Sequence, residues 1–259
     1  MWIDREIGVK RGASFALWGL MRFLLLFWRA LPFADRFTSP RAARMGMWQA
    51  FGATLAFGAF HSWLCSSRTK TATQKLVGAR FGRGFYRLFF NLQALVSSIA
   101  LVAFVVSRPQ KVVHRASTTE RYFHWAVQLA SLIVALWSVK ELRFRHFSGV
   151  ESALDAARNR ESSAEPEAQT PDGSDGLELE RGPYAWSRHP IEWAPLLLLW
   201  ATPLLKTNWL GFNLATTIYM IFGVWQEEKR LAAKGGEAWR RYCSRVSIVF
   251  GRKPFSGSL

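Results

Sequence analysis

The sequence predicts an all-α membrane protein: a polytopic bundle of five to six transmembrane helices, followed by an amphipathic C-terminal helix on the cytoplasmic surface. Three observations predict this fold class. Hydrophobic residues make up 50% of the 259-residue chain. They gather in long blocks, and a helix that crosses a bilayer needs about 17 to 25 mostly apolar residues. The blocks also lack the alternation of polar and apolar residues that marks the strands of membrane barrels.

The apolar blocks, in chain order, are Ala13–Phe33, Met47–Cys65, Phe85–Ser107, Tyr122–Val139, Pro190–Leu205 and Trp209–Trp225. The first contains Arg22 and Arg29, whose spacing places them on one face of a helix. This block fits either a spanning helix whose arginines pack against the bundle or an amphipathic helix in the membrane interface. Pro190–Leu205 is short for a span, so we expect tilt or its polar flank to extend it.

The net charge of +16 conceals two regions of opposite sign. Residues 151–180 contain nine acidic residues and two arginines, so the rest of the chain is strongly basic. The basic residues adjoin the apolar blocks, which indicates contact with anionic membrane lipids and not with nucleic acid. With six spans, most of the Lys and Arg residues outside the blocks fall on the side that holds the N-terminus. The positive-inside rule places this side in the cytoplasm.

We expect three regions along the chain. Residues 1–147 form the N-terminal transmembrane helices, residues 148–180 a flexible acidic cytoplasmic insert, and residues 181–259 a helical hairpin with a C-terminal tail. The second half of the insert is too polar to bury a core, whereas a short helix fits Val150–Arg160. In the tail, Trp239, Tyr242 and Val246 recur at helical spacing, which predicts an amphipathic helix on the membrane surface.

The segment Arg181–Pro190, RGPYAWSRHP, leads from the polar insert into the hairpin. Pro190 suits the first turn of a helix, because its missing N–H would be unpaired there in any case. That helix therefore directs unpaired N–H groups and the positive end of its dipole toward Arg188 and His189, an arrangement that suits an anionic ligand group. The structural alternative is that Tyr184 and Arg188 only anchor the chain at the membrane interface.

A second polar cluster, Gln226–Glu228, lies where the hairpin ends on the same side of the membrane. Two adjacent acids at a membrane boundary are normally paired or functional, so an ion pair between Arg188 and Glu227 or Glu228 is compatible with the sequence. The alternative is a solvated helix end held by pairs within the helix, such as Glu227 with Arg230.

His61 lies deep in the second apolar block. A lone histidine on an apolar helix usually packs, but an ionisable group inside a span also marks a functional site. The histidines and the two cysteines show none of the local spacings of metal sites, so we predict no metal. The chain also lacks the glycine-rich motifs of soluble nucleotide-binding domains.

The two polar clusters together resemble a known family. Gly-Pro-Tyr, Arg-His-Pro, an apolar hairpin, Glu-Glu-x-x-Leu and Gly-x-x-Trp-x-x-Tyr are similar to the isoprenylcysteine carboxyl methyltransferase and phospholipid methyltransferase superfamily. The matching residues are Gly182, Pro183, Tyr184, Arg188, His189, Pro190, Glu227, Glu228, Leu231, Gly236, Trp239 and Tyr242. FHSWLCSSRTK and FYRLFFNLQALV, in the N-terminal half, resemble the methanethiol S-methyltransferase branch and the related NnrU membrane proteins.

The resemblance implies an integral, multi-pass membrane enzyme that transfers a methyl group from S-adenosylmethionine at the cytoplasmic face. Residues 181–259 then form the catalytic hairpin and the cofactor-binding tail. The residues implied in cofactor binding are Tyr184, Arg188, His189, Pro190, Glu227 and Glu228. The methyl acceptor implied is a small thiol, as in the methanethiol branch, or a lipophilic molecule that approaches from the membrane.

The chain departs from the family pattern after Arg-His-Pro, where Glu192 replaces a tyrosine and Ala194 a glycine. We interpret Glu192 as a catalytic group on the acceptor side or as a partner for Arg188. His61 is the second catalytic candidate, since a thiol must lose its proton before it attacks. Isoprenylcysteine carboxyl or phospholipid methylation stays open as an alternative, as does a non-enzymatic NnrU-like accessory protein.

Overall fold

The computed structural model describes residues 38–141, 148–158 and 181–251. Within these ranges the chain is almost entirely helical, as expected. The helices are α2 (Pro40–Cys65), α3 (Ser67–Val77), α4 (Ala79–Ser107), α5 (Thr118–Glu141), α7 (Val150–Ala157), η1 (Gly182–Ala185), α8 (Pro190–Trp200), α9 (Thr207–Lys234) and α10 (Gly236–Arg245). The apolar block Ala13–Phe33 and the second half of the acidic insert lie outside the described residues.

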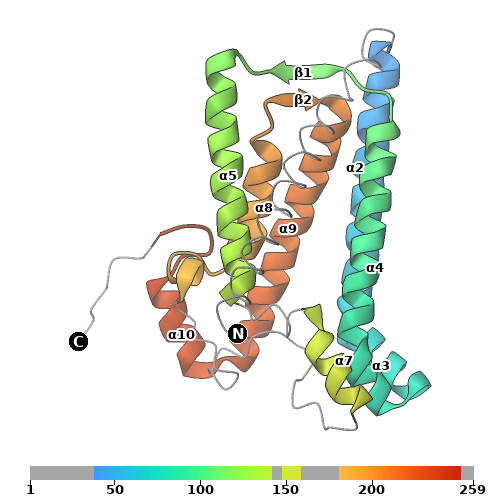
Figure 1. Cartoon of the computed structure of the whole chain (residues 1–259), viewed down its shortest axis with the longest axis vertical. Helices are drawn as coiled ribbons and strands as arrows, with labels where there is room; N and C mark the ends of the chain where they lie inside the picture. The colour runs from blue at the N-terminus through green and yellow to red at the C-terminus, as the bar shows by residue number, and fades with distance from the viewer. Residues whose placement is uncertain (1–37, 142–147, 159–180, 252–259) are drawn as a thin grey trace, which may run out of the picture.

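Two long helices, α2 and α9, form the central packing of the bundle, and α4 lies beside α2 (Figure 1). Glycines allow the close approach: a Cβ at Gly58 would overlap the ring of Tyr219, and a Cβ at Gly211 would overlap the carbonyl of Met47. Small residues at such contacts let helix backbones approach closely in membrane bundles. On the other side of α9, helix α8 packs against α5.

A short antiparallel sheet departs from the all-α expectation. Strand β1 (Val112–Arg115) pairs with β2 (Leu204–Lys206) at one end of the bundle, and α3, α7 and α10 lie at the other end (Figure 1). The pairing joins segments that are distant in sequence, which local patterns do not reveal. Lys206, at the end of β2, is 1% exposed, so this end of the bundle is closely packed.

Helix α8 corrects the expectation of one long span over Pro190–Leu205. The helix contains only 11 residues and ends at Trp200, just before Thr202 and Pro203. Because a proline disfavours helical geometry in the residue before it, Pro203 stops the helix, and the chain passes through a turn into β2. At a rise of about 1.5 Å per residue, α8 is roughly 16 Å long, about half the thickness of a bilayer core.

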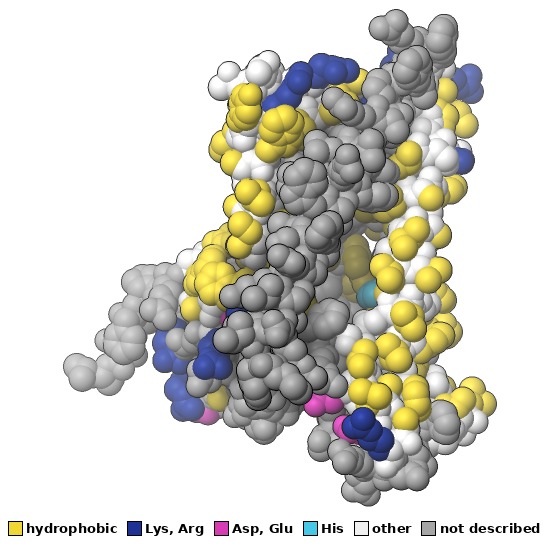
Figure 2. All heavy atoms as spheres, in the orientation of Figure 1, with side chains coloured by type: hydrophobic (Ala, Val, Ile, Leu, Met, Phe, Trp, Pro, Cys, Tyr) yellow, Lys and Arg dark blue, Asp and Glu magenta, His cyan; other side chains and the backbone are white. Residues whose placement is uncertain are grey.

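Two described helices are long and apolar enough to cross a membrane: Gly84–Ser107 of α4 and Thr118–Glu141, the whole of α5. Most of their side chains point outward and not into the bundle. Figure 2 shows hydrophobic side chains along the length of the visible helices, whereas Lys and Arg side chains gather mainly toward the two ends. This distribution is typical of a protein surface that faces lipid along its middle.

The predicted short helix at the start of the insert is confirmed as α7, which packs on α4. A Cβ at Gly84 would overlap the Cβ of Ala156, so the glycine permits this contact. The amphipathic tail helix is confirmed as α10, and its apolar residues Trp239 and Tyr242 are buried together with Val246.

Candidate active site

The segment before α8 folds as the proline and glycine positions indicate. Gly182 has a φ of +52°, a conformation that glycine adopts readily, and opens η1 close to Trp137 of α5. Pro190 occupies the first turn of α8, as predicted. Between them, the Ser187 hydroxyl accepts a hydrogen bond from the backbone N–H of His189, at 3.2 Å, and so fixes the two residues that precede the helix.

The C-terminal tail is fastened to this segment through its backbone. The N–H of Arg188 donates to the carbonyl of Ser247, at 2.9 Å, and the N–H of Gly251 donates to the carbonyl of Trp186, at 2.8 Å. The carbonyl of Ile248 accepts from the Ser187 hydroxyl and from the indole N–H of Trp193. In α10, which precedes this tail, the hydroxyl of Tyr242 donates to the carbonyl of Tyr184, at 2.7 Å. Two segments about 60 residues apart therefore form one unit.

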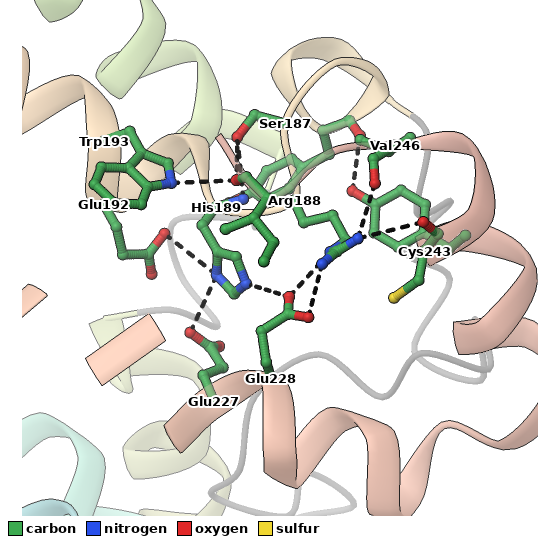
Figure 3. Close-up of polar contacts among 12 residues, drawn as sticks. Ser187, Arg188, His189, Glu192, Trp193, Glu227, Glu228, Cys243 and Val246 are labelled. Atoms are coloured by element: carbon green, nitrogen blue, oxygen red, sulfur yellow. Dashed lines mark hydrogen bonds and ion pairs between the residues drawn. The ribbon is translucent and has the colours of Figure 1, made fainter. Parts of the chain in front are cut away.

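Arg188 forms the centre of this unit (Figure 3). Its Nε and Nη2 donate to the two carboxylate oxygens of Glu228, at 3.0 and 2.8 Å, and its Nη1 donates to the carbonyl of Val246, at 2.8 Å. The side chain is only 5% exposed. A paired, two-point contact between Arg and a carboxylate is among the strongest hydrogen-bonded arrangements in proteins. The guanidinium therefore joins the loop before α8, the end of α9 and the tail.

His189 lies beside this pair and is enclosed by carboxylates. Its Nε2 is 2.6 Å from Oε1 of Glu228, while its Nδ1 is 3.5 Å from Oε2 of Glu227 and 3.8 Å from Oε2 of Glu192 (Figure 3). Burial alone would lower the pKa of His189, but the hydrogen bonds with Glu227 and Glu228 and the charge of Glu192 outweigh it and raise the pKa to about 9. The imidazole is therefore cationic at neutral pH in the protein without ligands.

Glu228 is held as a carboxylate by the same contacts. Partial burial would raise its pKa, but hydrogen bonds from His189 and Arg188, together with their positive charges, lower it below the usual value. Its side chain is 20% exposed, so one side of the carboxylate stays within reach of a ligand.

The structure brings together most of the residues that the sequence nominated. Arg188, His189, Glu192, Glu227 and Glu228 meet in one cluster, with Tyr184 and Pro190 on the segment that carries it. The expected ion pair forms between Arg188 and Glu228, and Glu192 contacts His189 instead of Arg188. Sequence reasoning missed Ser187 and the carbonyls of Val246 and Ile248, because backbone acceptors leave no side-chain signal in a sequence.

His61 lies apart from this cluster in its contacts. Its ring packs against those of Phe57, Phe90 and Tyr219, with ring centroids 5.7, 4.6 and 6.3 Å away. Among the described residues its buried Nδ1 has no hydrogen-bond partner. Its catalytic role stays a prediction.

One feature of the cluster had no counterpart in the sequence. Ligand atoms of His189, Glu192 and Glu227 lie within 4.8 Å of one another, which is compatible with a bound metal ion. The residues come from the start of α8 and the end of α9, so no local motif spacing could reveal them. The expectation of no metal rested on such spacings alone.

Comparisons with known proteins point to one group of enzymes. The methanethiol S-methyltransferase of Pseudomonas deceptionensis is 37% identical over 106 residues, which cover 40% of this chain and 36% of that protein. Methanethiol S-methyltransferase 1 of Bradyrhizobium diazoefficiens is 26% identical over 200 residues, 74% of this chain and 62% of that protein. The corresponding enzyme of Mycobacterium tuberculosis is 35% identical over 66 residues, 26% of this chain and 27% of that protein.

The chain thus matches less than two thirds of the length of these relatives. No family model and no solved structure matches it. The resemblance on which the sequence motifs rested is nevertheless confirmed: the chain is similar to the methanethiol S-methyltransferases.

Proposed function

We propose that this protein is an integral-membrane methyltransferase that uses S-adenosylmethionine to methylate a small thiol. One observation carries the proposal: the motifs shared with methyltransferases fold into a single charged cluster at the meeting point of the loop before α8, the end of α9 and the tail. Such a cluster would be costly at a membrane boundary without a function. The names of the similar proteins favour methanethiol, or a thiol like it, as the acceptor.

The residues present fit the methyl donor, with one change of role from the sequence-based expectation. Arg188 is engaged by Glu228 and by backbone carbonyls, so it positions Glu228 and does not bind the carboxylate of the donor. Glu228 keeps an exposed edge that can accept a hydrogen bond from a ribose hydroxyl or from the donor's ammonium group, and Glu227, 24% exposed, lies beside it. His189 and Pro190 set the start of α8, and the carbonyl of Tyr184 accepts a hydrogen bond from the Tyr242 hydroxyl.

S-adenosylmethionine supplies a methyl group on a positively charged sulfur, and an aromatic surface favours such a cation. Trp186 is 38% exposed next to the cluster and packs edge-on against Trp137, with ring centroids 6.0 Å apart. In the transfer, a bond forms between the acceptor sulfur and the methyl carbon while the bond from that carbon to the donor sulfur breaks. The electron pair stays on the donor sulfur, and the acceptor's proton has already left, because the thiolate is the nucleophile. The protein's contribution is to position the reactants and exclude water.

The proposal includes several membrane spans and an active site on the cytoplasmic side. It is supported by the two long apolar helices, by exposed apolar side chains along α2, α4, α5 and α9, and by the basic residues at the ends. Isoprenylcysteine or phospholipid methylation and a non-enzymatic accessory role are alternatives that no observation favours over thiol methylation.

The test is calorimetric titration of S-adenosylmethionine into the full chain in detergent. We expect saturable binding that Glu228→Gln and His189→Ala abolish. The matched control is Glu237→Gln, which removes an exposed carboxylate on α10 that also pairs with an arginine. If both site variants bind as well as the control while all elute as folded protein, the site is assigned wrongly. A folded wild-type chain that never binds the donor points to the accessory role.

Labelled-methyl transfer then identifies the acceptor. We expect methanethiol to accept the label, and farnesylcysteine and phospholipid not to. Label transferred only to farnesylcysteine, or only to phospholipid, would identify that molecule as the acceptor in place of a thiol.

A further inference from the structure

On the Nδ1 side of His189, the carboxyl groups of Glu192 and Glu227 both face the imidazole. Oε2 of Glu192 is buried and accepts no hydrogen bond among the described residues, and Oε2 of Glu227 lies 3.5 Å from Nδ1 of His189. A buried carboxylate oxygen without a donor is unfavourable. The imidazolium of His189 is the positive group that faces these two carboxyl groups, and a bound cation would take the place of its Nδ1 proton.

We propose that His189, Glu192 and Glu227 bind one divalent metal ion of the zinc class, and that this ion receives the thiol acceptor. The separations fit: donor atoms about 2.1 Å from a tetrahedral zinc ion lie roughly 3.4 Å apart. Nδ1 of His189 is 3.5 and 3.8 Å from the two carboxylate oxygens, and all three ligand atoms lie within 4.8 Å of one another. One imidazole with two carboxylates is a ligand set that suits first-row divalent ions.

The far side of His189 is built as metal-binding histidines usually are. Nε2 contacts Oε1 of Glu228 at 2.6 Å, which fixes the ring and directs Nδ1 toward Glu192 and Glu227. Glu228 is fixed in turn by two hydrogen bonds from Arg188, whose guanidinium is held by the carbonyl of Val246. Metal-bound histidines almost always donate their other N–H to such a carboxylate, and the partner is itself hydrogen bonded. To bind, the ion must displace the proton that His189 carries on Nδ1.

Three protein ligands leave a coordination position open, as in catalytic zinc sites. A thiol that takes this position binds as the thiolate and releases its proton to solvent, because a coordinated thiol is deprotonated. The thiolate is the form that attacks a methyl group. The role given to the ion rests on the proposed thiol acceptor, whereas the metal site itself rests only on the geometry of the cluster.

The experiment measures the metal directly. The full chain in detergent is stripped with a chelator, titrated with Zn²⁺ and dialysed, and its metal content is determined. We expect one zinc per chain in the wild type, none retained by Glu192→Gln or Glu227→Gln, and binding about 10- to 100-fold weaker in Glu228→Gln, which removes only the carboxylate that orients the imidazole. The control Glu120→Gln removes an exposed carboxylate at the start of α5 and should retain the metal.

A spectroscopic arm tests the thiol. Cobalt loaded in place of zinc should gain a sulfur-to-metal charge-transfer band when methanethiol is added, and Glu192→Gln should lose it. No saturable zinc binding by folded wild type, or equal retention by Glu192→Gln, overturns the metal site. Titration of S-adenosylmethionine into the chelator-treated protein separates the two proposals. If Glu192→Gln and Glu227→Gln lose the donor while no variant binds zinc, the carboxylates hold the donor's cation instead of a metal.

Discussion

Removing the Arg188 side chain should destabilise the proposed donor site, although Arg188 itself does not bind the donor. In Arg188→Met, Glu228 loses two hydrogen bonds at 3.0 and 2.8 Å, and the carbonyl of Val246 loses its donor at 2.8 Å. Removing one partner of a buried ion pair costs about 3–5 kcal/mol. Because Glu228 is 20% exposed and water can solvate it in part, we expect the lower end of that range, about 3 kcal/mol. Arg188→Lys keeps the charge but cannot bond both oxygens, so it should recover only part of the loss.

The assay is thermal unfolding in detergent combined with a double-mutant cycle. A loss of about 3 kcal/mol lowers the melting temperature of a chain of this size by roughly 6–12 °C. The cycle of Arg188→Met with Glu228→Gln should give a coupling of about 2–3 kcal/mol. The chain contains a control in Arg240 and Glu237: Nε and Nη2 of Arg240 donate to a single oxygen of Glu237, at 3.2 and 2.8 Å, and the two side chains are 73% and 61% exposed.

The exposed pair should couple by only about 0.2–1 kcal/mol. If the two cycles give the same coupling, Arg188 does not hold the site together, and the assignment of Glu228 to a fixed position fails with it.

Three further predictions concern packing, acceptor chemistry and the tail. Gly46→Ala should destabilise the protein by about 1–3 kcal/mol, because the new Cβ overlaps the carbonyl of Pro109, whereas Gly52→Ala, with no neighbour within 4 Å, should be neutral or stabilising in the same melts. His61→Phe should lower the rate of thiol methylation and leave the dissociation constant for S-adenosylmethionine unchanged; an unchanged rate would remove His61 from the chemistry. Deleting residues 246–259 should abolish donor binding, because the acceptors for Arg188, Ser187 and Trp193 are lost, whereas deleting 252–259 should leave these bonds and donor binding in place.

The meeting of the two polar clusters could be predicted from the sequence because both flank the same apolar hairpin. Arg188 had two adjacent carboxylates within reach, and the choice of Glu228 over Glu227 depends on the rotation of α9 against the loop, which no local pattern encodes. The tail helix was predictable because Trp239 and Tyr242 follow helical spacing.

The connections that make the tail part of the site were not predictable, because they use the carbonyls of Val246, Ser247 and Ile248. The three proposed metal ligands could not be predicted from the sequence for a related reason. Glu192 lies three residues after His189, but Glu227 joins them only through the packing of α9.

The shortness of α8 explains how residues so far apart in sequence reach the same level. From Thr207 to Glu228, α9 rises about 32 Å at 1.5 Å per residue. Helix α8 supplies only about 16 Å, and a turn at residues 201–203 joins it to β2, which runs across the end of the bundle (Figure 1). His189 lies beside Glu228, about 30 Å along α9 from the β1–β2 sheet. A continuous helix from Pro190 through Leu205 would rise about 24 Å, roughly a quarter less than that distance. Because Pro203 ends α8 early, the residues after Trp200 leave the helix and can cover more distance per residue than a helix does, which helps to bring the imidazole level with the carboxylates.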